Sequence, residues 1–122
     1  MTGIPEGLTR IAVDAMGGDD GPAVTVPAAL RAIGNGGVAI ALVGDQVAIQ
    51  VELDRTDNPA KELVQIVPAQ GVVQEEESPA LAFRSKPRAS VFVAAGVVKA
   101  GEADGFVSMG STGASIAAAT VV

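Results

Sequence analysis

Short runs of β-branched and aliphatic residues recur along the chain and are separated by stretches of helical length. The runs fall at Arg10–Asp14, Val38–Val43, Val64–Val67 and Asp104–Ser108. We interpret each run as a strand, because this length and composition are typical of strands that are buried on both faces. Strands that alternate with helices form βαβ units, so the pattern predicts an α/β domain with a mainly parallel sheet.

Apolar residues at helical spacing predict a helix between the first two strands. Val26, Leu30 and Ile33 fall on one face of that helix. Thr25 is the expected N-cap and Gly34 the expected end, since hydroxyl residues and glycine favour these two positions.

The remaining segments are less regular. Residues 46–53 alternate apolar and polar positions as a strand does, but the order of the units favours a helix here. Residues 55–62 are expected to be a loop, because an Asn-Pro pair disfavours the α conformation. Further helices are expected from Pro79, over residues 89–101 and over residues 114–122. The sequence shows no linker or repeat, so its 122 residues form one domain or part of one.

Composition limits the classes of function. Hydrophobic residues make up 48% of the chain and aromatic residues only 2%, so Val, Ala, Ile and Leu build the core, as in a buried parallel sheet. The chain has no cysteine and no histidine, which excludes disulfides, thiolate metal sites and an imidazole base. A formal charge of −6 disfavours a nucleic-acid or anionic-membrane surface. The apolar runs are shorter than the roughly 20 residues of a membrane span, and residues 1–10 do not resemble a signal peptide, so we expect a cytoplasmic protein.

Two glycine-rich loops stand out from this scaffold. The first, VDAMGGDDGP, leaves the first strand at Val13–Pro22, and the second, SMGSTGA, leaves the last strand at Ser108–Ala114. The carboxyl ends of parallel strands lie at one edge of the sheet, so we expect both loops to open onto one crevice. Glycine lets a backbone approach a ligand closely, and a helix N-terminus presents unpaired amides with a partial positive charge. These features favour an anion such as phosphate.

Neither loop matches the common nucleotide fingerprints. GSTG lacks the GxxxxGK[ST] pattern of a P-loop, and GGDDG lacks the GxGxxG spacing of a dinucleotide site, so neither ATP nor NAD is expected as a cofactor. One or two aspartates are no metal signature, and no metal is expected. Two structural explanations stay open: a small-residue turn that lets helices pack closely in the second loop, and a glycine-rich turn with Asp20 capping the next helix in the first.

The motifs RIAVDAMGGD and DGFVSMGSTGA, in this order and with VGD between them, resemble the N-terminal third of the bacterial phosphate:acyl-ACP acyltransferases of the PlsX type. The resemblance runs from Arg10 to the end of the chain. It implies a three-layer α/β/α fold related to isopropylmalate dehydrogenases and phosphotransacetylases, of which residues 1–122 form the N-terminal portion. It also implies an enzyme of phospholipid biosynthesis that makes acyl-phosphate from acyl carrier protein (ACP) thioesters and inorganic phosphate. A homodimer, and peripheral membrane association through the rest of the protein, are implied as well.

On this interpretation the two loops form the phosphate and acyl site. Asp14 and Asp19 repel an anion, so we expect them to accept hydrogen bonds from loop amides or to orient a hydroxyl. Phosphate is already negative at pH 7, so its attack on a thioester needs orientation and oxyanion donors rather than a base. The expected cradle is the second loop, and the facing wall is the first: Ser108, Gly110, Ser111, Thr112 and Gly113 against Met16, Gly17 and Gly18.

Several positions depart from the family pattern. Asp20 adds a negative charge beside the expected anion site, and Ser111 stands where the family often has Asn. The segment 81–90 corresponds to a more uniformly basic stretch and is interrupted by Pro87. Its three cations are candidates for docking the acidic carrier protein, the alternative being a solvated basic turn: Arg84, Lys86 and Arg88.

Two other classes of function stay open. One is a non-catalytic truncated relative that serves as an anion-binding or interaction module, and the other is a flavodoxin-like binder of a nucleotide or small molecule. The segment Gln74–Ser78 is interpreted as a solvated lead into a helix. Val43–Asp45 is a strand exit that structure explains as well as ligand contact does.

Overall fold

The computed structural model describes residues 7–74, 76–110, 115–116 and 118–119. All four predicted strands are present, and they form one sheet of parallel strands in the order β3-β2-β1-β4. The elements are β1 (Thr9–Asp14), α1 (Pro22–Gly34), β2 (Val38–Gly44), α2 (Gln46–Asp54), the 3-10 helix η1 (Pro59–Leu63), β3 (Val64–Pro68), α3 (Pro79–Ser85), α4 (Ser90–Lys99) and β4 (Gly105–Ser108).

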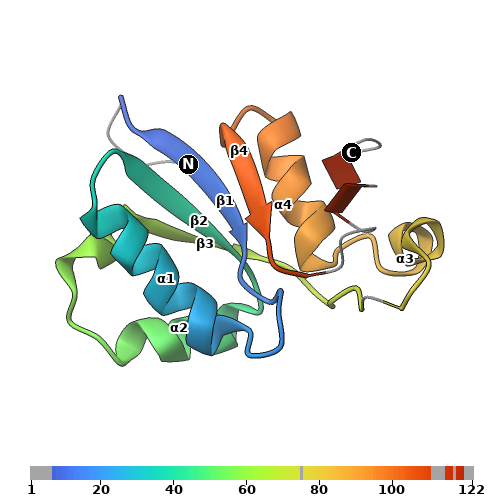
Figure 1. Ribbon diagram of the computed structural model, residues 1–122, viewed down its shortest axis with the longest axis horizontal. Coiled ribbons are helices and arrows are strands. Elements are labelled where there is room, and N and C mark those ends of the chain that lie inside the picture. The colour runs from blue at the N-terminus through green and yellow to red at the C-terminus, as the bar shows by residue number, and fades with distance from the viewer. Residues whose placement is uncertain (1–6, 75, 111–114, 117, 120–122) are drawn as a thin grey trace.

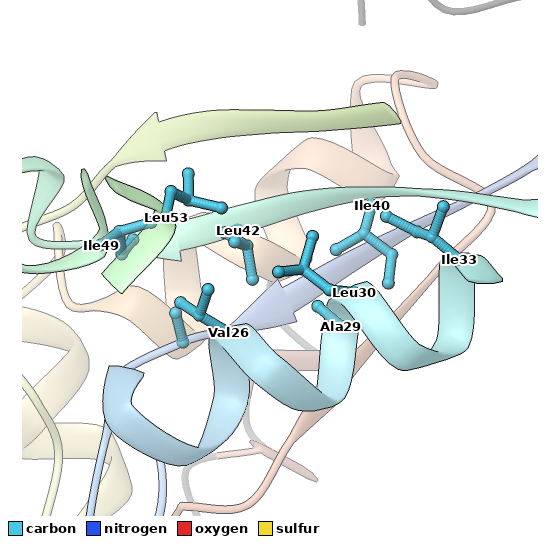
Figure 2. Close-up of a cluster of buried hydrophobic side chains, with 9 residues drawn as sticks. Val26, Ala29, Leu30, Ile33, Ile40, Leu42, Ile49 and Leu53 are labelled. Atoms are coloured by element: carbon cyan, nitrogen blue, oxygen red, sulfur yellow. The ribbon is translucent and has the colours of Figure 1, made fainter. Parts of the chain in front are cut away.

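Helices cover both faces of this sheet (Figure 1). On one face, Val26, Leu30 and Ile33 of α1 pack against Ile40 and Leu42 of β2, together with side chains of α2 (Figure 2). The expected apolar stripe of this helix is therefore confirmed, and it lies in the core.

The other face of the sheet is covered by α4. Ala94 and Val97 of α4 pack against Ala12 of β1 and Val43 of β2. On its outer side α4 contacts α3, where the ring centroids of Phe83 and Phe92 lie 4.9 Å apart in an edge-to-face arrangement. Helices, sheet and helices thus form three layers, which confirms the predicted α/β fold.

The chain reverses its direction across the sheet between β1 and β4. From β1 the chain proceeds outward to β2 and β3. It then returns through α3 and α4, which connect β3 to β4, and β4 lies on the opposite side of β1. After β1 the chain enters α1 on one face, whereas after β4 the helical residue Ala118 packs with α4 on the other. Ligands of open α/β sheets bind at such a switch point, outside the carboxyl ends of the strands.

The start of α1 differs from the prediction. The helix begins at Pro22, and Gly21 occupies the N-cap position with φ of 56°, four residues before the expected N-cap at Thr25. Proline favours the first helical position because its φ is already helical and it has no amide to leave unpaired. Thr25 is therefore not the N-cap. It lies buried in the first turn, and its hydroxyl donates to the Ala15 carbonyl at 2.7 Å.

The less regular segments have mixed outcomes. Residues 46–53 are helical, as predicted, and Asp45 caps α2 by accepting hydrogen bonds from two amides, those of Val47 at 2.9 Å and Ala48 at 3.1 Å. The helices predicted from Pro79 and over residues 89–101 are also confirmed. The prediction of a loop over 55–62 is wrong in part, because residues 59–63 form η1.

The Thr25 hydroxyl connects α1 to the loop after β1. Replacing Thr25 by Val keeps the side-chain shape but leaves the buried Ala15 carbonyl without this donor. We expect a loss of about 1–3 kcal/mol in the free energy of unfolding, measured by urea denaturation. Thr25→Ser retains the hydroxyl and serves as the control. Equal stability of the Val variant and the wild type would contradict a stabilising role for this hydrogen bond.

Candidate anion site at the switch point

Strand register brings the two predicted loops together. Asp14 at the end of β1 is paired with Ser108 at the end of β4, so both side chains lie on the same face of the sheet. The Ser108 hydroxyl donates to Asp14 Oδ2 at 2.8 Å. Asp14 is only 3% exposed, although it is a carboxylate. The loops after β1 and β4 thus begin side by side, joined by a hydrogen bond between their first side chains.

Both side chains also bind backbone amides of their own loops. Asp14 Oδ1 accepts from the Met16 amide at 3.1 Å, and the Asp14 carbonyl accepts from the Gly17 amide at 3.3 Å. Ser108 Oγ accepts from the Gly110 amide at 3.1 Å. A buried carboxylate needs such partners, and here they fix the path of both loops. Asp14 therefore fixes the start of the loop after β1 and orients the Ser108 hydroxyl.

The backbones of the two loops touch at glycine. A Cβ atom at Gly17 would lie 2.8 Å from the Gly110 nitrogen and 3.1 Å from the Met109 nitrogen. Real Cβ atoms essentially never come within 3.0 Å of another heavy atom, so only glycine fits at position 17. Gly18, with φ of 81°, lies beside the Met109 side chain. Close approach of the loops, rather than turn geometry, explains Gly17.

Met16 packs against β2, whereas the neighbouring Gly17 and Gly18 contact the second loop. A Cβ atom at Gly44 would lie 2.8 Å from Met16 Sδ, so this thioether packs over the end of β2. Gly44 thereby makes room for Met16, and Asp45 caps α2. These contacts supply a structural explanation for the strand exit at Val43–Asp45.

A small hollow of about 120 Å³ opens beside the touching loops. Among the described residues, the amides of Gly18, Asp19 and Met109 have no hydrogen-bond acceptor. Drug-sized ligands occupy pockets of about 300–1,000 Å³, so this hollow suits a small ion better than a nucleotide. It is lined by Gly18, Asp19, Val72, Val73, Gln74, Met109 and Gly110.

The third wall of the hollow, Val72–Gln74, was not predicted from the sequence. It follows β3, whose carboxyl end lies at the same edge of the sheet as the two loops. Figure 1 shows the chain leaving β3 and running along this edge toward α3. The parallel topology was the signal that could have located it, because every strand exit borders that edge.

The three basic residues predicted to dock a partner differ in their surroundings. Arg84 and Arg88 are exposed. Lys86 is half-buried, and its ammonium group lies 2.8 Å from Glu77 Oε1 and donates to the Val72 carbonyl at 3.2 Å. Lys86 thus contacts the wall of the hollow, whereas its two neighbours face solvent.

Three predicted cradle residues, Ser111, Thr112 and Gly113, lie outside the described residues. The described part of the chain contains no group of three or more His, Cys, Asp or Glu residues that could hold a metal ion. Its helices are also too short or too polar to cross a membrane.

A larger hollow of about 530 Å³ lies between α1 and the end of α2. Its lining includes Arg31, Glu52 and Arg55, but no residue of either glycine-rich loop. The switch point, not the size of the hollow, selects the candidate site.

The comparison with known protein families agrees with these motifs. Residues 9–122 match the family described as "Fatty acid synthesis protein". The chain belongs to this family. The match begins at the first residue of β1 and includes both glycine-rich loops.

Several relatives of the family carry the name phosphate acyltransferase. The chain is 46% identical over 110 residues to the protein from Picosynechococcus sp., and this alignment covers 90% of the chain and 30% of the relative. The alignment with the protein from Thermosynechococcus vestitus is 50% identical over 115 residues and covers 94% of this chain and 33% of the relative. The alignment with a protein from Desulfitobacterium hafniense is 48% identical over 111 residues and covers 91% of this chain and 32% of the relative. The chain spans about a third of the length of these relatives.

The contact at Gly17 gives a sharp test of the touching loops. Gly17→Ala places a Cβ against two backbone nitrogens, which a side-chain rotation cannot relieve. We expect the loops to separate at a cost of about 1–3 kcal/mol in unfolding free energy, with changed NMR shifts at the Met109 and Gly110 amides. Gly34→Ala is the matched control, because no atom lies within 4 Å of its Cβ position and its φ is negative. A neutral Gly17→Ala variant would rule out the contact.

The contact between Lys86 and Glu77 predicts a dependence on pH. The hydrogen bond from Lys86, and then that from the Gln74 amide, lower the pKa of Glu77 from its usual value of 4.5. A lowered pKa means that the contact is complete above pH 4.5 and is lost as the pH falls through the lower folded-state value. NMR titration of the Gln74 amide is expected to show a midpoint below 4.5 that Glu77→Gln abolishes. A midpoint at or above 4.5 would contradict the contact.

Proposed function

We propose that this chain forms the phosphate-binding part of a phosphate acyltransferase active site, which makes acyl-phosphate from acyl-ACP and inorganic phosphate in phospholipid biosynthesis. The observation that carries the proposal is the contact of Gly17 with Gly110 at the switch point, beside amides that have no acceptor among the described residues. The name phosphate acyltransferase of the relatives supplies the reaction.

The chemistry matches a site built from amides. An oxygen of hydrogen phosphate attacks the thioester carbonyl carbon, the carbon–sulfur bond breaks, and the phosphate proton passes to the departing thiolate, which leaves as the free thiol. The nucleophile is already an anion, so orientation and stabilisation of the oxyanion supply the rate enhancement. A chain without histidine is suited to this reaction, because no imidazole has to remove a proton.

The described donors and hydroxyl have distinct roles in this proposal. The amides of Gly18, Asp19 and Met109 bind phosphate, and Asp14 and Ser108 hold their loops in place. Ser111, Thr112 and Gly113 complete the cradle as a prediction that the described residues do not test. Asp14 is occupied by two hydrogen bonds, and Asp19 and Asp20 are exposed to solvent.

The partners follow from the same proposal. Arg84 and Arg88 are exposed cations and are the better candidates for docking an acidic carrier protein, since Lys86 is paired with Glu77. We propose a homodimer in the cytoplasm, with peripheral membrane association through the two-thirds of the relatives that this chain does not cover.

A second function is compatible with the same hollow. The chain spans about a third of the length of its relatives, and the hollow would bind an anion with or without turnover of a thioester. A non-catalytic anion-binding or interaction module has the same hollow and differs only in the absence of acyl-phosphate formation.

Titration with inorganic phosphate tests the site directly. In ¹⁵N–¹H NMR spectra of the 122-residue chain, we expect the amides of Gly18, Asp19 and Met109 to shift together along one binding curve. Chloride at the same ionic strength is the control for screening, and AMP is expected to bind less well because the hollow is small. Shifts that spread over the surface, or that chloride reproduces, would contradict the site.

Ser108→Ala tests the connection between the loops. It removes the donor to Asp14 and the acceptor for the Gly110 amide, so we expect about tenfold weaker phosphate binding from the loss of about 1–1.5 kcal/mol. Ser85→Ala, which removes an exposed hydroxyl in α3, is the matched control.

A mixture of the wild-type chain with palmitoyl-ACP and phosphate is expected to show no turnover. Rapid acyl-phosphate formation would show that these residues form a complete active site.

A further inference from the structure

The third wall of the hollow is held in place by backbone hydrogen bonds at its start. The Ala69 amide donates to the Gly44 carbonyl at 2.9 Å, which extends the pairing of β3 with β2 by one residue. The Gln70 amide then donates to the Arg88 carbonyl, and the Gly71 carbonyl accepts from the Ser90 amide. These bonds fix residues 69–71 to the sheet and to the start of α4, immediately before the wall.

The wall itself is held by one ion pair. Lys86 Nζ donates to the Val72 carbonyl at 3.2 Å and lies 2.8 Å from Glu77 Oε1. The same Glu77 oxygen accepts from the Gln74 amide at 3.0 Å, and the Gln74 carbonyl accepts from the Glu77 amide. The carbonyl of Val72 and the amide of Gln74 are therefore both directed at the Lys86–Glu77 pair.

The peptide between Val72 and Val73 has its carbonyl and amide on opposite sides. Its bond is trans, so the Val73 N–H points away from the carbonyl that Lys86 holds. Among the described residues this amide has no acceptor, although the Val73 side chain is 4% exposed and packs with α3 and α4. Val73 also lines the hollow, so its amide is available to donate to a ligand there.

We propose that Lys86 is a positioning residue that orients the Val72–Val73 peptide, so that the Val73 amide donates to an anion in the hollow. This inference rests on the proposed anion site and adds a donor from a third strand exit. Lys86 acts through the peptide rather than by its own charge, because Glu77 neutralises that charge. Its donation to the Val72 carbonyl also polarises the peptide and strengthens the N–H as a donor.

The Val73 amide gives the first readout. In a titration of the 122-residue chain with inorganic phosphate, we expect its NMR signal to shift with the same binding curve as the signals of Gly18 and Met109. If these two signals shift and that of Val73 does not, the assignment of Val73 is wrong while the anion site stands. If no amide signal responds, the anion site and this assignment both fail.

Variants of Lys86 separate orientation from charge. Lys86→Met removes the donor but keeps the length of the side chain, and we expect about tenfold weaker phosphate binding and no response at Val73. Lys86→Arg retains donors for the Val72 carbonyl and is expected to restore most of both. Lys99→Met removes the same charge from an exposed position in α4, outside the lining of the hollow, and serves as the matched control with wild-type phosphate binding. Equal weakening in Lys86→Met and Lys99→Met would overturn the positioning role.

A check on folding keeps this test interpretable. The Met16 amide is held by Asp14, far along the chain from Lys86, so its NMR signal reports whether the first loop keeps its shape. We expect this signal to be unchanged in Lys86→Met while those of Val72, Val73 and Gln74 move. Unchanged signals at the third wall would show that Lys86 does not hold it, whatever the affinity for phosphate.

Discussion

A buried carboxylate is the interaction on which the candidate site depends. Asp14 is paired in register with Ser108, and its two oxygens accept from the Ser108 hydroxyl and the Met16 amide. Because the hydrogen bond from Ser108 to Asp14 joins the ends of two adjacent strands, the sheet sets the distance between the loops. Without the hydrogen bonds of Asp14, two glycine-rich loops would have many conformations, and ordering these loops would cost binding free energy.

A site made of backbone amides would reconcile the proposed anion binding with a chain of net charge −6. Cationic side chains would attract phosphate over a longer range, but their charge is screened beyond about 8–10 Å at physiological salt. Amides act only at contact, and they require the close approach that Gly17 and Gly110 allow. Selectivity for a small anion then comes from the dimensions of the hollow rather than from the overall charge.

Hydrophobic runs predicted all four strands, and the order of the units predicted a parallel sheet. The pattern is clearest in β2, where six of seven residues are buried. Glycine content predicted the loops at Val13–Pro22 and Ser108–Ala114, of which the second is described only as far as Gly110. The place of Met16 was not predictable, because it depends on the space above Gly44 in another strand. The third wall was missed for a similar reason: Val72 and Val73 form no motif, and their polar contacts are made by the backbone.

The same distinction explains why Lys86 was grouped with Arg84 and Arg88. Spacing in a basic turn does not show which cation faces inward, and only the fold brings Glu77 and the Val72 carbonyl to the Lys86 ammonium. In a site whose donors are main-chain amides, side chains control ligand binding by orienting peptides. Asp14 and Ser108 do this for two loops, and Lys86 does it for the third wall in our proposal. Residues that govern such a site therefore lie behind the surface that the ligand contacts, and a search limited to exposed polar side chains would miss them.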